Sequence, residues 1–229
     1  VVPCHHAIFH LRVFENLLGR TVIVRDIDTG ILISRRAKSA FRIATLKGDI
    51  LNPGGSLTRA EFCKLAVELM GNGDKVASQM NRTVFQDVPS THWARGYIAV
   101  ATQGTTTGSG DTAVTTPGII RGDAYGNFNP DRAITYGEAV TILVRILGYG
   151  DSDVGMVWPD GYLAKADELE ITEGLNLTAN DTITRGQAAL MMENLLFTNS
   201  KEGKEYLTTL GCTITDETIL FDVAATAPD

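Results

Sequence analysis

The sequence predicts a mainly α-helical protein of 229 residues, built around three similar helices. Two observations predict this fold class. A Thr-x-x-Glu/Gln pattern, preceded by Leu or Ile, occurs at Thr58, Thr135 and Thr184, with spacings of 77 and 49 residues. Each copy is followed by apolar residues at helical spacing. Three helices of one kind, each with one face to bury, favour a pseudo-symmetric cluster that shares a core.

Each repeat has the chemistry of a helix N-terminus. The threonine hydroxyl accepts a hydrogen bond from the amide three residues later, and the Glu or Gln there reaches back to the threonine amide. The first two helices are expected to stop at glycines, Gly71 and Gly73 after the first and Gly148 and Gly150 after the second, as is usual where a C-terminal turn needs positive φ. The predicted buried faces are Phe62, Leu65, Ala66 and Leu69; Ala139, Ile142, Leu143 and Ile146; and Ala188, Met191, Met192 and Leu195.

Composition excludes several classes of protein. A net charge of −7 and a pI near 5.1 have the wrong sign for a nucleic-acid binder. No stretch reaches the roughly 18 apolar residues of a transmembrane segment. The first residues lack a signal-peptide pattern, so an export signal is expected outside this chain. Cys4, Cys63 and Cys212 are too few and too widely spaced for a disulfide framework or a paired metal site, and Cys63 lies in a predicted core stripe.

The two ends differ from the middle of the chain. Residues 1–49 carry a net charge of +4 and the remainder carries −11, a change that marks a boundary between units. Residues 1–45 show no copy of the repeat; a β-hairpin is expected there, with strands at 21–24 and 31–33. Residues 198–229 are expected to form an extension with short strands.

The middle copy of the repeat is the most complete. Residues 104–117, rich in Thr and Gly, interrupt it and are predicted to form an exposed loop. Ser90 or Thr91 is expected to cap a helix on which Trp93 and Tyr97 share one stripe. The ordered motif of this copy reads Phe85-Gln86-Asp87-Val88, His92-Trp93-Ala94, Tyr97-Ile98, Gly118-Ile119-Ile120-Arg121-Gly122, Phe128-Asn129-Pro130 and Ile134-Thr135-Tyr136-Gly137-Glu138.

This ordered set resembles the S-layer homology (SLH) module. The resemblance is complete over residues 81–150, including the insertion, partial over 46–80, and degenerate over 151–197. Modules of this family usually occur in threes. The fold implied by the resemblance is a mainly α, pseudo-threefold helical bundle with short loops or hairpins between lobes, to which the two ends add small β elements.

The resemblance also implies a function. Proteins with these modules are exported and held noncovalently on the bacterial cell wall by a secondary cell-wall polysaccharide, often one that ends in a pyruvylated sugar. It implies no enzyme activity, cofactor or metal. The partners it implies are the wall polysaccharide and other surface-layer subunits. The alternative is an SLH-like scaffold or protein-interaction module without glycan binding, favoured by the incomplete first and third copies.

Candidate ligand residues follow from matching positions in the motif. An arginine beside a helix N-terminus suits the carboxylate of a pyruvate ketal, and an aromatic ring suits a sugar face. In the second copy a tyrosine replaces the motif arginine, so fewer than three equivalent anion sites are expected. Trp93 suits a core position equally well, and Asp87 suits a turn cap equally well. The candidates implied by the resemblance are Arg59, Arg185, Asp87, Trp93, Tyr136 and Gly122.

Other chemistry has weaker support in the sequence. His5, His6 and His10 include a pair at helical spacing that suits a metal ion, but no carboxylate motif accompanies them. Residues 123–131 are rich in acids and amides but lack the spacing of a calcium loop, so a turn is predicted there. The sequence contains no nucleophile elbow, phosphate-binding loop or zinc-hydrolase helix. No residue is therefore a candidate for catalysis.

Overall fold

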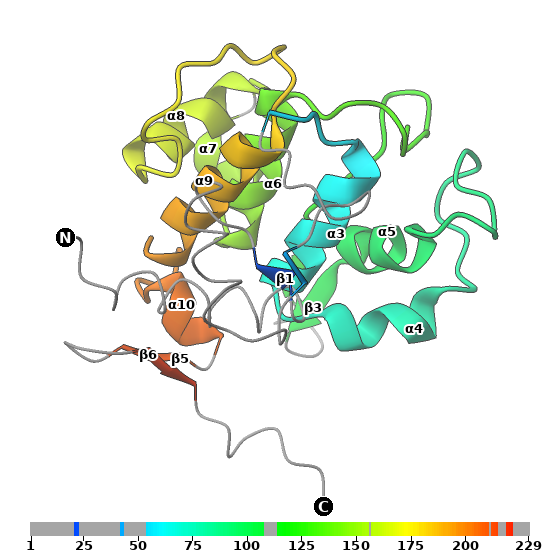
Figure 1. The fold of residues 1–229 in the computed structure, drawn as a ribbon, viewed down its shortest axis with the longest axis horizontal. Coiled ribbons are helices and arrows are strands. Elements are labelled where there is room, and N and C mark those ends of the chain that lie inside the picture. The colour runs from blue at the N-terminus through cyan, green and yellow to red at the C-terminus, as the bar shows by residue number, and fades with distance from the viewer. Residues whose placement is uncertain are drawn as a thin grey trace, which may run out of the picture.

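The fold is mainly α-helical, as the sequence predicts (Figure 1). The computed structural model describes residues 21–22, 42–43, 54–107, 114–155, 157–210, 212–214 and 219–221. Three helices form its centre: α3 (Arg59–Leu69), α6 (Tyr136–Ile146) and α9 (Arg185–Leu196). Each begins directly after its capping threonine, because the predicted caps satisfy the amides of the first turn.

Each central helix has a shorter helix packed against it. Helix α5 (Arg95–Thr102) packs on α3, and α8 (Asp160–Glu168) packs on α6. Helix α10 (Tyr206–Thr209) contacts α9, and the Tyr206 hydroxyl donates to the Leu69 carbonyl at the end of α3, 3.2 Å away. Two further short helices complete the described part: α4 (Val76–Gln79), which follows the 3₁₀ turn η1 (Gly73–Lys75), and α7 (Asp151–Val154).

The predicted helix faces form the core. Ten of the twelve residues predicted for them are buried, while Leu65 and Ile146 are half-buried and pack against the core from its edge. Cys63 is fully buried beside them, as predicted, and burial raises the pKa of its thiol. Gly71 and Gly148 follow α3 and α6 with φ of +69° and +94°, as predicted, whereas Gly73 begins η1 and Gly150 has a φ of −105°, so neither of these two has the expected positive φ.

The insertion in the middle copy differs from the predicted loop. Strands β3 (Thr105–Thr107) and β4 (Val114–Thr116) pair antiparallel, so the inserted segment leaves and returns as a short hairpin. Its runs of Thr and Val suit strand pairing, whereas the glycines at 108 and 110 favour a loop. The tip of the hairpin lies outside the described residues.

Short strands also occur towards both ends. Strand β1 (Thr21–Val22) pairs with β2 (Arg42–Ile43) in parallel, whereas the turn and second strand of the predicted hairpin lie outside the described residues. Strands β5 (Cys212–Ile214) and β6 (Ile219–Phe221) pair antiparallel within the region where strands are predicted. No helix in the part of the chain that the structure describes is long and apolar enough to cross a bilayer.

Candidate functional site

The three helix starts share the predicted capping box. At the start of α3, Thr58 Oγ1 accepts from the amide of Glu61 (3.2 Å), and Glu61 Oε2 accepts from the amide of Thr58 (2.8 Å). The same reciprocal bonds occur at the starts of α6 and α9. In each box the Glu or Gln uses one side-chain atom for the cap, so its second terminal atom remains for another partner.

The first amides of each central helix donate to the loop that precedes another central helix. Such amides lack partners inside their own helix and can hold an anion when they are free. The bonds are Arg59 N to Arg132 O (2.8 Å), Ala60 N to Pro130 O (2.9 Å), Tyr136 N to Asp181 O (2.7 Å), Gly137 N to Ala179 O (2.9 Å) and Arg185 N to Gly55 O (2.8 Å). These amides already donate to loop carbonyls, so an anion near the helix starts would have to be bound by side chains and by the helix dipole.

Arg59 is buried and fully engaged. Its Nε donates to the Phe128 carbonyl (2.8 Å), one terminal nitrogen donates to the Arg121 carbonyl (2.6 Å), and the other lies 3.1 Å from Glu138 Oε1. The guanidinium also lies over the Phe128 ring, 5.0 Å from its centroid. Only 8% of the side chain is exposed, and burial lowers its pKa against the opposing charge of Glu138. Arg59 therefore joins α3 to the loop before α6 and to α6 itself.

Glu138 connects two arginines. Its Oε1 lies 2.6 Å from the Arg132 guanidinium as well as 3.1 Å from Arg59, while Oε2 accepts from the Thr135 amide. Burial acts to raise the pKa of Glu138, but the hydrogen bond from Arg132 and the charge of Arg59 outweigh it, and the pKa is lowered. The carboxylate is thus held ionised between two cations.

Arg185 occupies the matching position at the start of α9 and is more accessible. Its side chain is 21% exposed, and one terminal nitrogen lies 3.6 Å from Glu61 Oε1. This separation is longer than a hydrogen bond, so the contact is a loose ion pair. Of the two predicted arginines, Arg185 has the more exposed side chain, 21% against 8% for Arg59.

Tyr136 takes the same position at the start of α6, and its side chain contributes to the core. It is 7% exposed, burial raises the pKa of its phenol, and a hydrogen bond with Thr172 partly opposes this rise. At the other two junctions the arginine faces the capping-box glutamate of the next helix. The residue at that glutamate position in α9 is Gln187. The junction between α6 and α9 therefore has neutral residues at both positions that hold charges elsewhere.

Asp87 and Gly122 hold the loop before α6. The Asp87 carboxylate accepts from the amides of Phe128 (2.9 Å) and Asn129 (2.6 Å), which uses both of its oxygens. A Cβ added at Gly122 would lie 2.6 Å from Phe85 Cε1. Together with Arg59, these residues fix one loop from two sides.

Trp93 lies on the surface just before α5, which begins later than predicted. Helix α5 has Ala94 as its N-cap without a side-chain cap, so neither Ser90 nor Thr91 caps it. Instead, His92 Nδ1 accepts from the Ala94 amide (3.2 Å). Trp93 is 48% exposed and stacks on the His92 ring, with 5.9 Å between centroids. Trp93 is thus an exposed ring and not a core residue.

A protein-family match covers the loop before α6 and the start of that helix. Residues 112–140 match the S-layer homology domain. The matched segment contains the end of the hairpin, Gly122, the loop that Arg59 and Asp87 hold, and the start of α6. The S-layer homology domain therefore coincides with the second half of the middle copy.

Three relatives extend the similarity over more of the chain. The chain is 38% identical over 167 residues (72% of this chain, 14% of the relative) to the "Middle cell wall protein" of Brevibacillus brevis. It is 38% identical over 169 residues (72% and 13%) to the "Surface layer protein" of Brevibacillus choshinensis. It is 33% identical over 155 residues (66% and 18%) to the "Cell surface protein" of Thermoanaerobacter kivui. The chain spans less than a fifth of the length of each.

A second exposed tryptophan was not among the predicted site residues. Trp158 precedes α8 as Trp93 precedes α5, and it is 57% exposed beside Val157, which is 67% exposed. Its indole nitrogen donates to Thr141 Oγ1 in α6 (3.0 Å), which fixes the ring beside that helix. The position before a short helix, followed four residues later by a tyrosine, is the sequence signal that relates it to Trp93.

A charge cluster that the sequence did not reveal lies mostly beyond the matched segment, which contains only its Arg121. Asp151 accepts from the Tyr162 hydroxyl (2.5 Å), from Arg121 (2.6 Å) and from Arg145 (3.0 Å). These bonds lower the pKa of Asp151, with the Tyr162 bond as the largest cause. The cluster joins the loop before α6, the end of α6, α7 and α8. Its partners are 30 residues or less from Asp151 in sequence, but no spacing rule links them.

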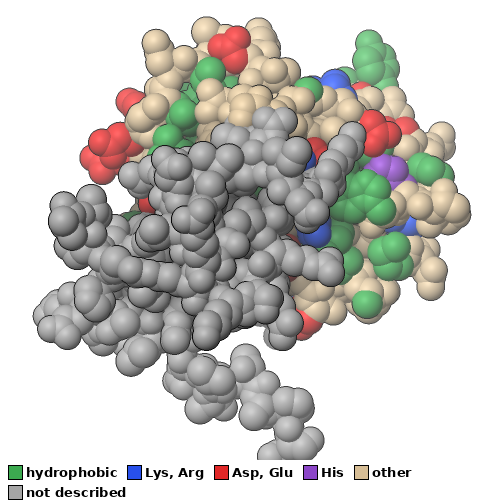
Figure 2. Space-filling model, in the orientation of Figure 1, with side chains coloured by type: hydrophobic (Ala, Val, Ile, Leu, Met, Phe, Trp, Pro, Cys, Tyr) green, Lys and Arg blue, Asp and Glu red, His purple; other side chains and the backbone are tan. Residues whose placement is uncertain are grey.

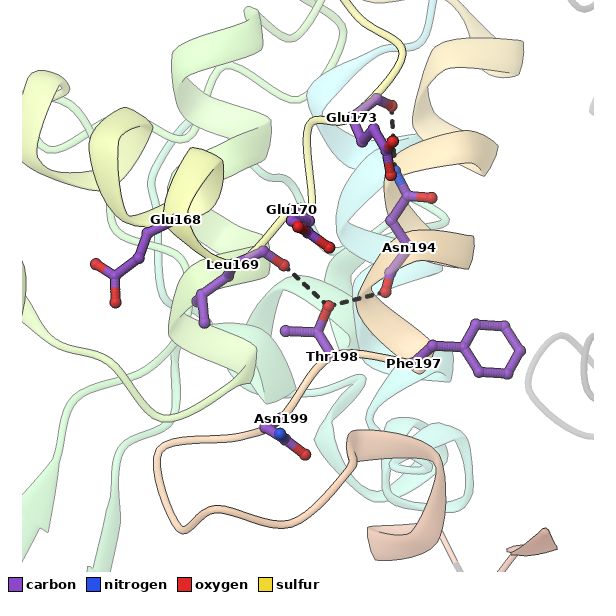
Figure 3. Close-up of a pocket in the computed structure, with 8 residues that line it drawn as sticks. All are labelled: Glu168, Leu169, Glu170, Glu173, Asn194, Phe197, Thr198 and Asn199. Carbon is purple, nitrogen blue, oxygen red and sulfur yellow. Dashed lines mark hydrogen bonds between the residues drawn. The ribbon is translucent and has the colours of Figure 1, made fainter.

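A cavity of about 390 Å³ lies apart from all of these residues, between the ends of α8 and α9 (Figure 3). The Asn194 amide donates to the carbonyls of Ile171 (3.1 Å) and Glu173 (3.2 Å). The Thr198 hydroxyl bonds within the same region, to the carbonyls of Leu169 and Asn194. These polar side chains therefore hold the backbone of the cavity wall together. Its lining residues are Glu168, Leu169, Glu170, Glu173, Asn194, Phe197, Thr198 and Asn199.

Charges on the visible described surface are dispersed. Basic side chains appear as separate spots among acidic ones, and no broad basic patch is seen on this face of the described part (Figure 2). Among the described residues, no group of three His, Cys, Asp or Glu side chains could hold a metal ion. The N-terminal histidines lie outside that part. An anionic ligand would accordingly depend on individual arginines.

Proposed function

We propose that this chain anchors a surface protein to the bacterial cell wall by noncovalent binding of a secondary wall polysaccharide that carries pyruvate ketals. The S-layer homology match and the names of the relatives support a place at the cell surface, and we infer export on the same ground. The observation that carries the polysaccharide part is the partly exposed Arg185 side chain, whose guanidinium lies 3.6 Å from its carboxylate partner, Glu61. Its forked donors suit a ligand carboxylate.

The proposed ligand fits the chemistry around the helix starts. A pyruvate ketal presents a carboxylate on a sugar ring, and the positive end of the α9 dipole favours an anion beside Arg185. The ring itself adds an apolar face, for which the exposed rings of Trp93 and Trp158 are suitable. Binding of this kind involves no bond-making step, and we propose no catalytic role and no cofactor.

We also infer that α3, α6 and α9 represent three modules around a pseudo-threefold axis. This is supported by the three capping boxes and by the closed order in which α3 bonds to the loop before α6, α6 to the loop before α9, and α9 to the loop before α3. Backbone bridges link the same loops: Ser56 with Thr184, Thr58 with Ala133, and Thr135 with Thr182. The first and third modules would be residues 46–80 and 151–197, and α10 supplies the short helix beside α9.

Sedimentation with purified cell walls tests the proposed function. The chain should sediment with walls that carry their secondary polysaccharide and remain in the supernatant with walls from which that polymer has been extracted. Removing only the pyruvate by mild acid should release most of the chain. Equal retention on intact and pyruvate-free walls would contradict recognition of the carboxylate, while leaving wall anchoring intact.

A structural scaffold is the second candidate function. Burial of Arg59 and the neutral residues Tyr136 and Gln187 favour it, because neither Arg59 nor Tyr136 then offers an accessible cation at its motif position. In this case the chain would contact other surface-layer subunits. The expected observation is concentration-dependent self-association in analytical ultracentrifugation, together with no retention on any wall preparation.

A further inference from the structure

The carboxylate at the third position of α3 performs two separate tasks. Glu61 Oε2 accepts from the Thr58 amide and completes the capping box, whereas Glu61 Oε1 lies 3.6 Å from the Arg185 guanidinium of α9. The Glu61 side chain is 15% exposed and that of Arg185 is 21% exposed, so the pair lies near the surface without being freely solvated. One glutamate therefore supports its own helix and partly neutralises the arginine of another.

This arrangement has a direct consequence for an anionic ligand. A carboxylate that approaches Arg185 must share the guanidinium with Glu61 and meets the negative charge of Glu61 at the same time. Like charges a few ångströms apart at a protein surface repel appreciably, because screening there is weaker than in bulk water. We propose that Glu61 acts as a built-in counter-ion that competes with the ligand for Arg185 and sets the affinity of this site. The inference rests on the proposed function, since it assumes a carboxylate ligand at Arg185.

The third copy shows how to separate the two tasks of Glu61. At the start of α9 the corresponding residue is Gln187. Its side-chain Oε1 accepts from the Thr184 backbone amide at 2.8 Å, and the Gln187 backbone amide donates to Thr184 Oγ1 at 3.3 Å. A glutamine therefore maintains the capping box without a negative charge. The Glu61→Gln variant is expected to keep α3 intact while it removes the charge that faces Arg185.

The start of α6 provides a matched control. Glu138 has the same place in its capping box, but it faces Arg59, whose guanidinium is 8% exposed and bonded to two carbonyls. Loss of the Glu138 charge removes one partner of Arg59 but leaves its guanidinium buried and bonded to the carbonyls of Phe128 and Arg121. The Glu138→Gln variant should consequently lower stability without any gain in ligand affinity, although the chemical change is the same as in Glu61→Gln.

Titration calorimetry with the purified, pyruvylated wall polysaccharide tests the inference. Glu61→Gln should bind about three- to tenfold more tightly than the wild type, on the basis of the repulsion removed. Glu138→Gln should show no gain, and neither variant should gain affinity for the polymer after its pyruvate is removed. The double variant Glu61→Gln with Arg185→Gln should bind as weakly as Arg185→Gln alone, because Glu61 acts through Arg185.

The outcomes distinguish this inference from the function on which it rests. If the wild type binds the pyruvylated polymer and Glu61→Gln binds equally or more weakly, Glu61 is not a competitor and the inference is wrong. A gain that persists in the Arg185→Gln background also contradicts it. If neither the wild type nor Glu61→Gln binds, the proposed function itself has failed. Circular dichroism of each variant verifies that α3 and the fold are retained.

Discussion

Replacing the two motif arginines by alanine should impair different properties of the protein, stability for Arg59 and ligand binding for Arg185. Arg59→Ala removes donors to the carbonyls of Phe128 (2.8 Å) and Arg121 (2.6 Å), an ion pair with Glu138 at 3.1 Å, and a stacking contact on a buried ring. Arg185→Ala removes a partly exposed ion pair at 3.6 Å. We therefore expect Arg59→Ala to act on the fold and Arg185→Ala to act on the ligand.

The magnitudes follow from these contacts. Hydrogen bonds from a charged donor contribute about 1.5–3 kcal/mol each, and loss of one partner from a buried ion pair costs about 3–5 kcal/mol. Because Arg132 still neutralises Glu138 (2.6 Å), we expect Arg59→Ala to lower the free energy of unfolding by about 3–5 kcal/mol. For a chain of this size, that corresponds to a fall in Tm of about 6–20 °C. Arg185→Ala should cost about 0–1 kcal/mol.

Urea unfolding followed by far-ultraviolet circular dichroism measures both variants under one condition. The m-value must stay constant, so that a shift of the midpoint reports stability alone. The reasoning is refuted if Arg59→Ala unfolds within about 1 kcal/mol of the wild type, or if Arg185→Ala is destabilised as strongly as Arg59→Ala. Either result would mean that the burial and bonding of Arg59 do not determine its role.

Three further predictions concern the same helix starts. The pKa of Glu138 is lower in the folded state than its unfolded value of about 4.3, so the ionised Glu138 stabilises the fold above that pH. This stabilisation is lost as the pH falls through the lower folded pKa. The urea midpoint should therefore fall between pH 6 and pH 3, and it should fall less steeply in Glu138→Gln. Tyr136→Arg combined with Gln187→Glu restores the charged pair of the other junctions, and a double-mutant cycle should show about 1 kcal/mol of favourable coupling; zero coupling would contradict the equivalence of the junctions. Gly122→Ala places a Cβ 2.6 Å from a packed ring carbon and should lower the free energy of unfolding by about 1–3 kcal/mol, measured by the same urea titration.

The central helices could be predicted because their signals are local. Each capping box involves residues three apart, and each buried face repeats within one helix, so the starts at Arg59 and Arg185 follow from short-range chemistry. The start of α5 was harder to predict, since its N-cap is Ala94 and no side chain caps the helix, so the usual capping signal is missing. The pairing of β3 with β4 was not predicted, because nearby glycines favour a loop although the Thr and Val residues have high strand propensity.

The candidate site was harder to predict because its contacts are long-range. Arg59 bonds to carbonyls 62 and 69 residues away, and these decide that it is buried. Asp87 reaches amides 41 and 42 residues away, which gives it the role of a loop cap. Sequence position alone made Arg59 and Arg185 equivalent. The three-dimensional neighbours separate them, and the loss of charge at both Tyr136 and Gln187 gains meaning only when Arg–Glu pairs are seen at the other two junctions.

Direct titration of the chain with purified wall polysaccharide, before and after removal of its pyruvate, tests the central claim most directly. The account predicts saturable binding to the pyruvylated polymer that becomes at least about tenfold weaker when the carboxylate is removed, consistent with loss of a charge-assisted contact. The same loss should occur in Arg185→Ala with the intact polymer. Undiminished binding of the pyruvate-free polymer, or of Arg185→Ala, would contradict the claim that Arg185 recognises the wall polysaccharide through its carboxylate.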